Sequence, residues 1–175
     1  RFFPSHRIIG EEGFKSSFSQ QDIVWYIDPI DGTNNFIKGR QEVTLHLSCL
    51  QDGVPLISFV GCPLSGNCYF SYDSSDAVYK LENDVTSIVQ TPALPEQVVI
   101  GTEFLESSDK ERSVFQSTLD ENTFSSLRIK SMGMNLICLL EGKSTAFYKA
   151  GVKLWDIMAP LGLLHHLDTF DITIG

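Results

Sequence analysis

The chain is short of basic residues and has no long hydrophobic run, and both shortages narrow its function. It carries 13 Lys and Arg against 22 Asp and Glu among 175 residues, a formal net charge of −9. Proteins bind nucleic acids and anionic membranes mainly through lysine and arginine, so an acidic chain without a basic cluster predicts neither partner. Its apolar runs fall far short of the roughly 20 residues that a transmembrane helix needs. We therefore expect a protein that binds cations and spans no membrane.

Paired cysteines are also missing. Cys49, Cys62, Cys68 and Cys138 form no C-x-x-C pair, which argues against a zinc knuckle and a dithiol redox motif. The N-terminal residues lack the apolar stretch and the small-residue cleavage site of a signal peptide. Reduced thiols and the lack of a leader predict a cytoplasmic protein.

The first half of the chain has the patterns of β-strands. Residues 23–27 (IVWYI) are β-branched and aromatic and end at Asp28-Pro29, which predicts a buried strand that runs into a loop. Polar and apolar residues alternate over 44–50, and Asp52-Gly53 supplies a turn before a return strand over 54–60. With a third strand over 67–72, these segments predict an antiparallel meander. We expect mainly loop over 74–95, with a short strand near 78–81.

Strands and helices alternate in the second half. The patterns predict strands over 98–101, 127–129, 146–148 and 170–174, and helices over 109–119, 135–141 and 156–166. Gly142 suits the position that follows the second of these helices. A meander followed by alternating strands and helices predicts one layered α+β or α/β domain over residues 1–175, with mixed sheets.

The segment 28–36 (DPIDGTNNF) is the densest chemical signal. Asp28 and Asp31, with the carbonyl of Ile30, offer the oxygen ligands that Mg²⁺ prefers. Gly32 allows a close approach of the backbone to a ligand, and the amides of Gly32 and Thr33 would face a phosphate. In the alternative, Asp31 only forms an Asx-turn and caps a short helix. The second aspartate and the preceding strand favour the metal site.

Two further carboxylates are ambiguous when each is taken alone. Glu11-Glu12 follows Ile8-Ile9-Gly10 and adds a third carboxylate, but adjacent glutamates are usually a solvated surface pair. Asp156 precedes an apolar helical pattern, where an aspartate is most often an N-cap.

Taken in chain order, three blocks resemble the signature of the inositol monophosphatase family: residues 9–12 (IGEE), 25–36 (WYIDPIDGTNNF) and 154–156 (LWD). The resemblance implies an α/β/α/β/α layered fold, usually dimeric. It also implies a Mg²⁺-dependent, Li⁺-sensitive phosphomonoesterase that acts on a small phosphorylated polyol or sugar, such as inositol monophosphate. The family normally has helices before the first block and a further strand and helix after the last, so we expect a chain shortened at both ends.

The resemblance assigns roles by position. Glu11, Asp28 and the Ile30 carbonyl would hold one metal ion, and Asp28, Asp31 and Asp156 a second, in a site of two or three Mg²⁺. The amides of Gly32 and Thr33 would bind the phosphate, beside Asp31. In-line attack by a metal-activated water is implied, with the Thr33 hydroxyl and Glu11 orienting and deprotonating it. A water near Asp156 would protonate the leaving group.

The chain departs from the family pattern around the substrate. Lys149 stands where the family usually has a carboxylate that binds sugar hydroxyls, and an ammonium group cannot accept those hydrogen bonds. Lys149 therefore either favours a substrate with a second negative charge or points to solvent. Gly133 and Asn135 lie in a segment that lines the substrate in the family, so we expect them at the substrate.

Three alternative functions remain open at this point. Fructose-1,6-bisphosphatase and nucleotide 3′-phosphatase activities belong to the same superfamily, and Lys149 favours them mildly. A third possibility is a member that binds metal or a partner without catalysis. The four histidines are expected to be structural or at the surface.

Overall fold

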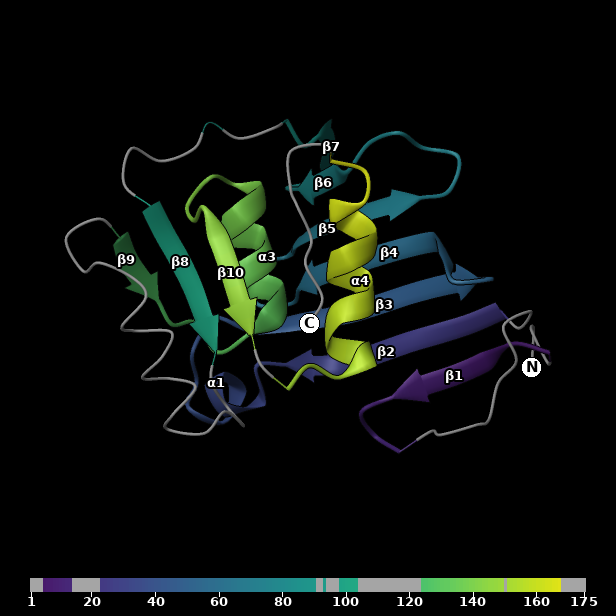
Figure 1. The fold of residues 1–175 in the computed structure, drawn as a ribbon, viewed down its shortest axis with the longest axis horizontal. Helices are drawn as coiled ribbons and strands as arrows, with labels where there is room; N and C mark the ends of the chain where they lie inside the picture. Colours follow the sequence, from purple (N-terminus) through teal and green to yellow (C-terminus); the bar gives the residue numbers. More distant parts are fainter. Residues whose placement is uncertain are drawn as a thin grey trace.

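A seven-stranded sheet forms the base of the protein in the computed structural model, which describes residues 5–13, 23–90, 93, 98–103, 124–149 and 151–167 (Figure 1). Its strands are ordered β1 to β7 along the sheet. They are β1 (Arg7–Gly10), β2 (Ile23–Asp31), β3 (Thr44–Gln51), β4 (Val54–Cys62), β5 (Asn67–Tyr72), β6 (Tyr79–Glu82) and β7 (Val85–Ile88). β1 runs parallel to β2, and every later neighbour is antiparallel, so the sheet is mixed.

The predicted meander is confirmed as β3, β4 and β5, with Asp52 and Gly53 at positive φ in the first turn. Two strands were missed. β7 pairs with β6 within the segment expected to be mainly loop. All four of its residues are exposed, so its sequence has no alternation of polar and apolar residues from which a strand could be predicted. β1 is only four residues long. The buried strand near residue 25 continues to Asp31, past its expected end at Ile27.

Among the described residues, three parallel strands form the second sheet, in the order β10, β8, β9. They are β8 (Val98–Glu103), β9 (Phe124–Leu127) and β10 (Ala146–Lys149). The helices of the described residues are α1 (Thr33–Ile37), α3 (Met132–Leu140) and α4 (Leu154–Leu164). α4 packs across β2 to β5, and α3 contacts β3 on one side and β10 on the other. α3 therefore lies between the two sheets (Figure 1), which confirms a layered fold in which the large sheet is mixed.

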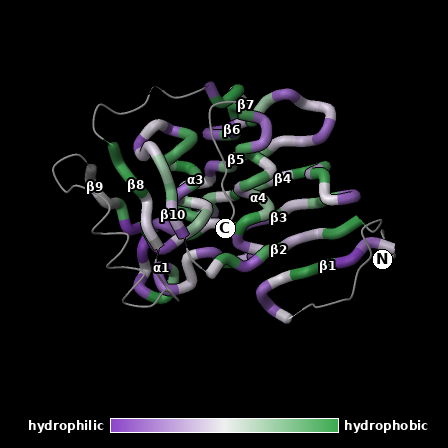
Figure 2. The backbone as a smooth tube through the Cα atoms, in the orientation of Figure 1, coloured by the Kyte–Doolittle hydropathy of each residue, from purple (hydrophilic) through white to green (hydrophobic). Residues whose placement is uncertain are grey.

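Two glycines let the helices approach the large sheet closely. A Cβ at Gly133 of α3 would overlap with Thr44 Oγ1, and one at Gly162 of α4 would overlap with the Ser58 hydroxyl. Figure 2 shows hydrophobic residues along β2, β4 and β8. The main core fills the space between the large sheet and the two longer helices. It contains Val60, Cys62, Tyr69, Val78, Leu136, Ile137, Leu140, Ala159, Leu163 and Leu167.

Several predicted boundaries were wrong. α3 begins three residues before the expected Asn135, because Ser131 caps it by accepting a hydrogen bond from the amide of Met134 at 3.2 Å. α4 begins at Leu154 and ends at Leu164, so Asp156 is its third residue and not its N-cap. The strand expected over 127–129 is β9, which ends at Leu127. The predicted helix over 109–119 and strand over 170–174 lie outside the described residues.

The four cysteines are free thiols in the structure, and all are buried or half-buried. Over the described ranges, no helix combines the length and the hydrophobicity that crossing a bilayer requires.

Candidate active site

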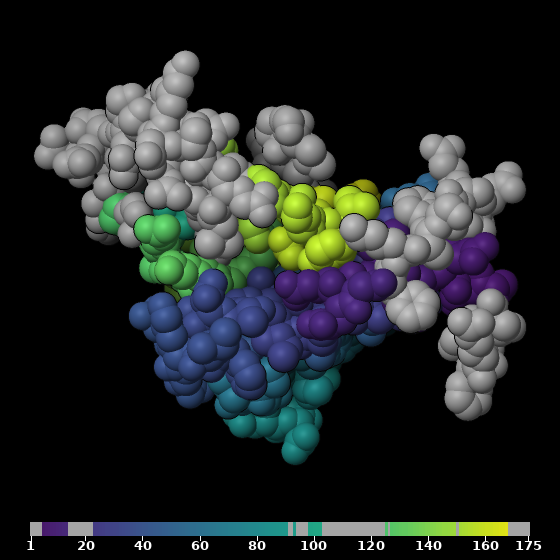
Figure 3. Space-filling view, turned by 90° about the horizontal axis from the view of Figure 1, so that it is seen from below, coloured from purple at the N-terminus to yellow at the C-terminus, as the bar shows by residue number. Residues whose placement is uncertain are grey.

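A pocket of about 250 Å³ opens where the end of β2 meets α4 and the end of β10. Figure 3 views this end of the molecule and shows purple and blue residues of the N-terminal half directly against yellow residues of α4. The pocket brings together side chains that lie up to 145 positions apart in the chain. Its lining residues are Glu11, Asp28, Ile30, Asp31, Gly32, Thr33, Asn34, Lys130, Lys149 and Asp156.

A break in the register of β2 directs both aspartates to the helical side of the sheet. Side chains of a regular strand alternate between its faces, so residues three apart point in opposite directions. The pairing of β2 with β3 shifts between Asp28 and Asp31, as in a β-bulge, and both side chains are buried, with 2% and 6% exposure. Asp28 Oδ1 accepts a hydrogen bond from the Ile30 amide at 3.0 Å, which holds the bulge in place.

Asp28 is a buried carboxylate with little compensation. Burial raises its pKa to about 7, and although His46 opposes the rise, the nearby carboxylates of Asp31 and Glu11 add to it. Among the residues that the structure describes, no lysine or arginine pairs with Asp28. A buried anion of this kind is stabilised strongly by a bound cation.

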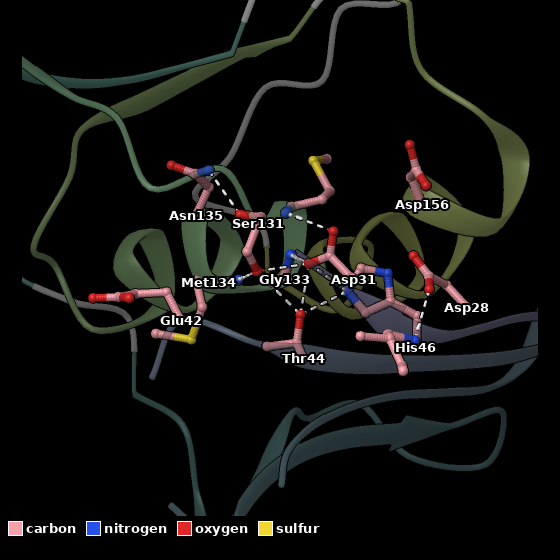
Figure 4. A network of polar contacts seen from close by, with 12 residues as sticks. Asp28, Asp31, Glu42, Thr44, His46, Ser131, Gly133, Met134, Asn135 and Asp156 are labelled. Carbon is pink, nitrogen blue, oxygen red and sulfur yellow. Dashed lines mark hydrogen bonds and ion pairs between the residues drawn. The ribbon is translucent and has the colours of Figure 1, made fainter. Parts of the chain in front are cut away.

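Asp31 is held by a network that reaches across 100 residues (Figure 4). Its Oδ2 accepts hydrogen bonds from the hydroxyls of Thr44 and Ser131, both at 2.6 Å, and from the Gly133 amide at 3.0 Å. Its Oδ1 accepts one from the Met132 amide at 3.1 Å. Asp31 therefore satisfies the amides at the start of α3. The alternative in which it caps the short helix after it is wrong, because α1 has no side-chain cap.

His46 lies behind Asp31 and is fully buried. Thr44 already donates its only hydroxyl proton to Asp31, so His46 Nε2, 3.2 Å from Thr44 Oγ1, must be the donor to that oxygen. The same Nε2 lies 3.5 Å from Asp31 Oδ2. Burial disfavours the imidazolium, but Asp31 raises the pKa of His46. Burial likewise opposes ionisation of Asp31, yet the hydrogen bonds from His46, Ser131 and Thr44 hold its pKa well below the usual range.

Gly32 and Thr33 form the turn that closes one side of the pocket. Gly32 has φ +83°, and a Cβ there would meet the Glu42 carbonyl at 2.8 Å, so only glycine fits without strain. The Thr33 hydroxyl donates to the Ile30 carbonyl at 3.0 Å, which leaves its lone pairs able to accept. Buried Asn35 fixes the turn by donating from Nδ2 to the carbonyls of Glu42 and Ile129, both at 2.8 Å.

Asp156 reaches the pocket from the first turn of α4 and forms an ion pair there. Lys149 Nζ lies 3.1 Å from Asp156 Oδ2, and the side chains are 8% and 16% exposed. Lys149 therefore does not point to solvent, and that alternative is wrong. In the view of Figure 4, Asp156 and Asp28 lie on the side of Asp31 away from Ser131 and Thr44.

A comparison with protein-family models matches residues 1–167 to the inositol monophosphatase family. The chain belongs to this family. Nus factor SuhB of Xylella fastidiosa is 26% identical over 170 residues, covering 94% of this chain and 59% of that protein. The fructose-1,6-bisphosphatase/inositol-1-monophosphatase of Thermotoga maritima is 26% identical over 161 residues, covering 92% and 59%. The chain thus spans about three fifths of the length of these relatives.

Solved inositol monophosphatases share the fold. Inositol monophosphatase II from Staphylococcus aureus superposes with a TM-score of 0.78 at 22% identity, over 94% of this chain and 63% of that one. An IMPase/NADP phosphatase complexed with Mg²⁺ and phosphate gives a TM-score of 0.78 at 20% identity, over 95% and 61%. The fold implied by the sequence blocks is confirmed.

The residues that the inositol monophosphatase signature assigns to metal all line the pocket: Glu11, Asp28, Ile30, Asp31 and Asp156. Gly32, Thr33 and Lys149 line it too. Within the described ranges, however, no three His, Cys, Asp or Glu side chains already stand close enough together to hold an ion.

Gly133 and Asn135 are not among the pocket-lining residues, contrary to the expectation that they meet the substrate. Gly133 lies under the pocket, where its amide binds Asp31. Asn135 is fully buried and faces Gly101 of β8, where an added Cβ would lie 2.6 Å from Asn135 Oδ1. Both residues therefore join α3 to the two sheets.

Sequence reasoning assigned no individual role in the site to His46, Lys130 or Ser131, although buried His46 agrees with the expectation of structural histidines. Nothing local marks them, since each is far from the 28–36 segment or lies in an ordinary strand pattern. Lys130 lines the pocket and has a left-handed backbone with φ 64°. That unusual conformation for a lysine is visible only in the structure.

Proposed function

We propose that this chain supplies the active site of a divalent-metal-dependent phosphomonoesterase that hydrolyses a small phosphorylated polyol or sugar, such as inositol monophosphate. The observation that carries the proposal is the pocket itself, which joins a buried, poorly compensated aspartate to the glutamate and the Gly32-Thr33 turn of the family signature. Family membership supports the reaction class, and a structural relative is described as complexed with Mg²⁺ and phosphate.

The first metal position fits the residues present. Glu11, Asp28 and Ile30 all line the pocket, and their two carboxylates and one carbonyl would offer oxygen ligands that suit a hard cation. The pKa of Asp28, about 7, indicates a carboxylate that gains from a positive neighbour. A bound Mg²⁺ would lower the pKa of a coordinated water and polarise the phosphoryl group.

The chain's own side chains would orient the attack. Thr33 donates its proton to the Ile30 carbonyl, so its oxygen would accept a hydrogen bond from the attacking water and fix the direction of that water. Glu11 is exposed at the mouth of the pocket, where it would take the proton. The amides of Gly32 and Thr33 would bind phosphate oxygens, and Asp156 would lie beside the leaving oxygen.

The second metal position that the resemblance implies fits less well. Asp31 Oδ2 already accepts from two hydroxyls and an amide, and Asp156 is paired with a lysine. These bonds would have to be broken or shared for Asp31 and Asp156 to bind an ion.

Fructose-1,6-bisphosphatase and nucleotide 3′-phosphatase activities are the nearest alternatives. Lys130 and Lys149 both line the pocket and would attract a second anionic group. The relative from Thermotoga maritima carries both the fructose-1,6-bisphosphatase and the inositol-1-monophosphatase names.

A role in binding without catalysis is a second candidate function. Several relatives carry the name Nus factor SuhB and not that of a phosphatase. The homodimer, the cytoplasmic location and the sensitivity to Li⁺ stay predictions.

Phosphate release tests the proposed function. Full-length protein would be assayed with inositol, sugar, glycerol and nucleotide phosphates, with Mg²⁺ or EDTA and with one series containing Li⁺. We expect Mg²⁺-dependent release that Asp28→Asn abolishes and that Asp52→Asn, at an exposed turn, leaves unchanged. Release that is insensitive to Asp28→Asn, or no release from any substrate, would contradict the proposal, and the latter result would favour the binding role.

A further inference from the structure

The ion pair between Lys149 and Asp156 is built into the backbone at this end of the pocket. Lys149 is the last residue of β10, and Gly151, at φ 71°, turns the chain into α4. Asp156 Oδ2 also accepts a 3.4 Å hydrogen bond from the Lys153 amide at the start of α4. The pair is mostly buried, unlike the mobile ion pairs of protein surfaces.

On this basis the carboxylates of the pocket divide into two groups. Asp31 and Asp156 have partners within the protein, whereas Asp28 and Glu11 form the second group. Asp31 is balanced by His46 and the hydrogen bonds from Thr44, Ser131 and the start of α3. Asp156 is balanced by Lys149. Asp28 and Glu11 are left to share whatever cation enters the pocket. Because a buried ion needs a partner, buried Asp28 is the carboxylate of this pocket that requires a cation from solution, and exposed Glu11 would add a ligand to it.

We propose that the ammonium group of Lys149 takes the place of a divalent ion at Asp156, so that the pocket binds a single divalent ion at Glu11, Asp28 and the Ile30 carbonyl. This inference rests on the proposed function and deepens it. An ammonium group has three donors, and Lys149 lines the pocket while it is held at Asp156. Lys149 would thus provide the positive charge for the phosphate and the leaving oxygen from within the chain.

The replacement of a second metal ion by Lys149 has a chemical consequence. A lysine side chain is always present in the pocket, whereas the occupancy of a second ion site would depend on the metal concentration in solution. Activity should therefore depend on metal concentration with an apparent order of one.

Counting bound Mn²⁺ tests the inference without reference to activity. Full-length protein without phosphate would be titrated with Mn²⁺ at pH 8 by calorimetry and by the electron paramagnetic resonance signal of free Mn²⁺. We expect one Mn²⁺ per chain for the unmodified protein and for Lys149→Arg, which keeps the charge. Lys149→Gln should bind two. Lys143→Gln removes an equal charge from an exposed ion pair outside the pocket and should still bind one.

Asp156→Asn provides a second test that does not depend on the stability of Lys149→Gln. If Asp156 binds lysine, this variant still holds one Mn²⁺; a count of zero would mean that Asp156 is a ligand of the bound ion and would overturn the inference. Two ions in the unmodified protein, or one in folded Lys149→Gln, would also overturn it while leaving the proposed metal site intact. No binding at all would remove both the inference and the metal basis of the proposed function.

Discussion

Replacing Asp28 with asparagine should stabilise the metal-free protein and abolish its proposed activity. Asp28 Oδ1 accepts a hydrogen bond from the Ile30 amide at 3.0 Å. Asparagine keeps an acceptor for this hydrogen bond and removes the buried charge. Gain of stability with loss of function is the mark of a residue kept for ligand binding and not for folding.

The size of the effect follows from the pKa of Asp28, about 7 against an ordinary value of 3.8. A folded-state pKa above the unfolded one means that the contribution to stability is present at low pH and is lost as the pH rises through 7. The loss between pH 5 and pH 7 amounts to roughly 2 kcal/mol, because the slope of about 1.4 kcal/mol per pH unit falls as the pH approaches the pKa. Relaxation of the site makes the real loss of stability smaller than this figure. We therefore expect the gain in the free energy of unfolding from Asp28→Asn to be about 1–3 kcal/mol larger at pH 8.5 than at pH 5.

Urea unfolding followed by circular dichroism, in EDTA at both pH values, measures this difference. Asp52→Asn is the control, because Asp52 is exposed in a turn at positive φ that asparagine adopts equally well. Adding Mg²⁺ should stabilise the unmodified protein but not Asp28→Asn. A variant that is less stable than the unmodified protein at pH 8.5, or whose advantage does not change with pH, would refute the reasoning.

Three further predictions concern the same site. Divalent metal affinity should rise about tenfold between pH 6 and pH 8, because below pH 7 Asp28 carries a proton that it must release before it can bind the metal. Calorimetry that finds equal affinities at the two pH values would contradict this. Ser131→Ala should lower the free energy of unfolding by about 1–3 kcal/mol, since it removes both the cap of α3 and a bond to Asp31, whereas exposed Ser74→Ala should change little in the same denaturation assay. Gly133→Ala should cost about 1–3 kcal/mol, because its Cβ would overlap with Thr44 Oγ1; an unchanged melting curve would show that α3 can move away from the sheet.

Local patterns predicted the parts of the fold whose side chains alternate or whose turns have strong signals. The meander was predicted because apolar alternation and Asp52-Gly53 lie close together in the sequence. β7 was not predicted because all its residues are exposed. α3 begins earlier than expected because its N-terminal amides are satisfied partly by Asp31, which comes 101 positions before Met132.

The same distinction applies to the site. Asp28, Asp31 and Thr33 stand in one dense segment, so their convergence could be predicted from the sequence. His46 has the position of an ordinary inward-facing strand residue, and only the fold brings it to Asp31. The departure at Lys149 was visible in the sequence, but its partner was not, because the turn at Gly151 determines that the ammonium group reaches Asp156.

The position of a bound ion tests the central claim most directly. Crystals of the full-length protein soaked in Mn²⁺ would be measured for anomalous scattering, which locates the ion without assumptions about substrate. We predict a peak in the pocket within ligand distance of Glu11, Asp28 and the Ile30 carbonyl oxygen, and its loss in Asp28→Asn. A pocket without a peak, in crystals whose Mn²⁺ appears only elsewhere on the protein, would contradict the account.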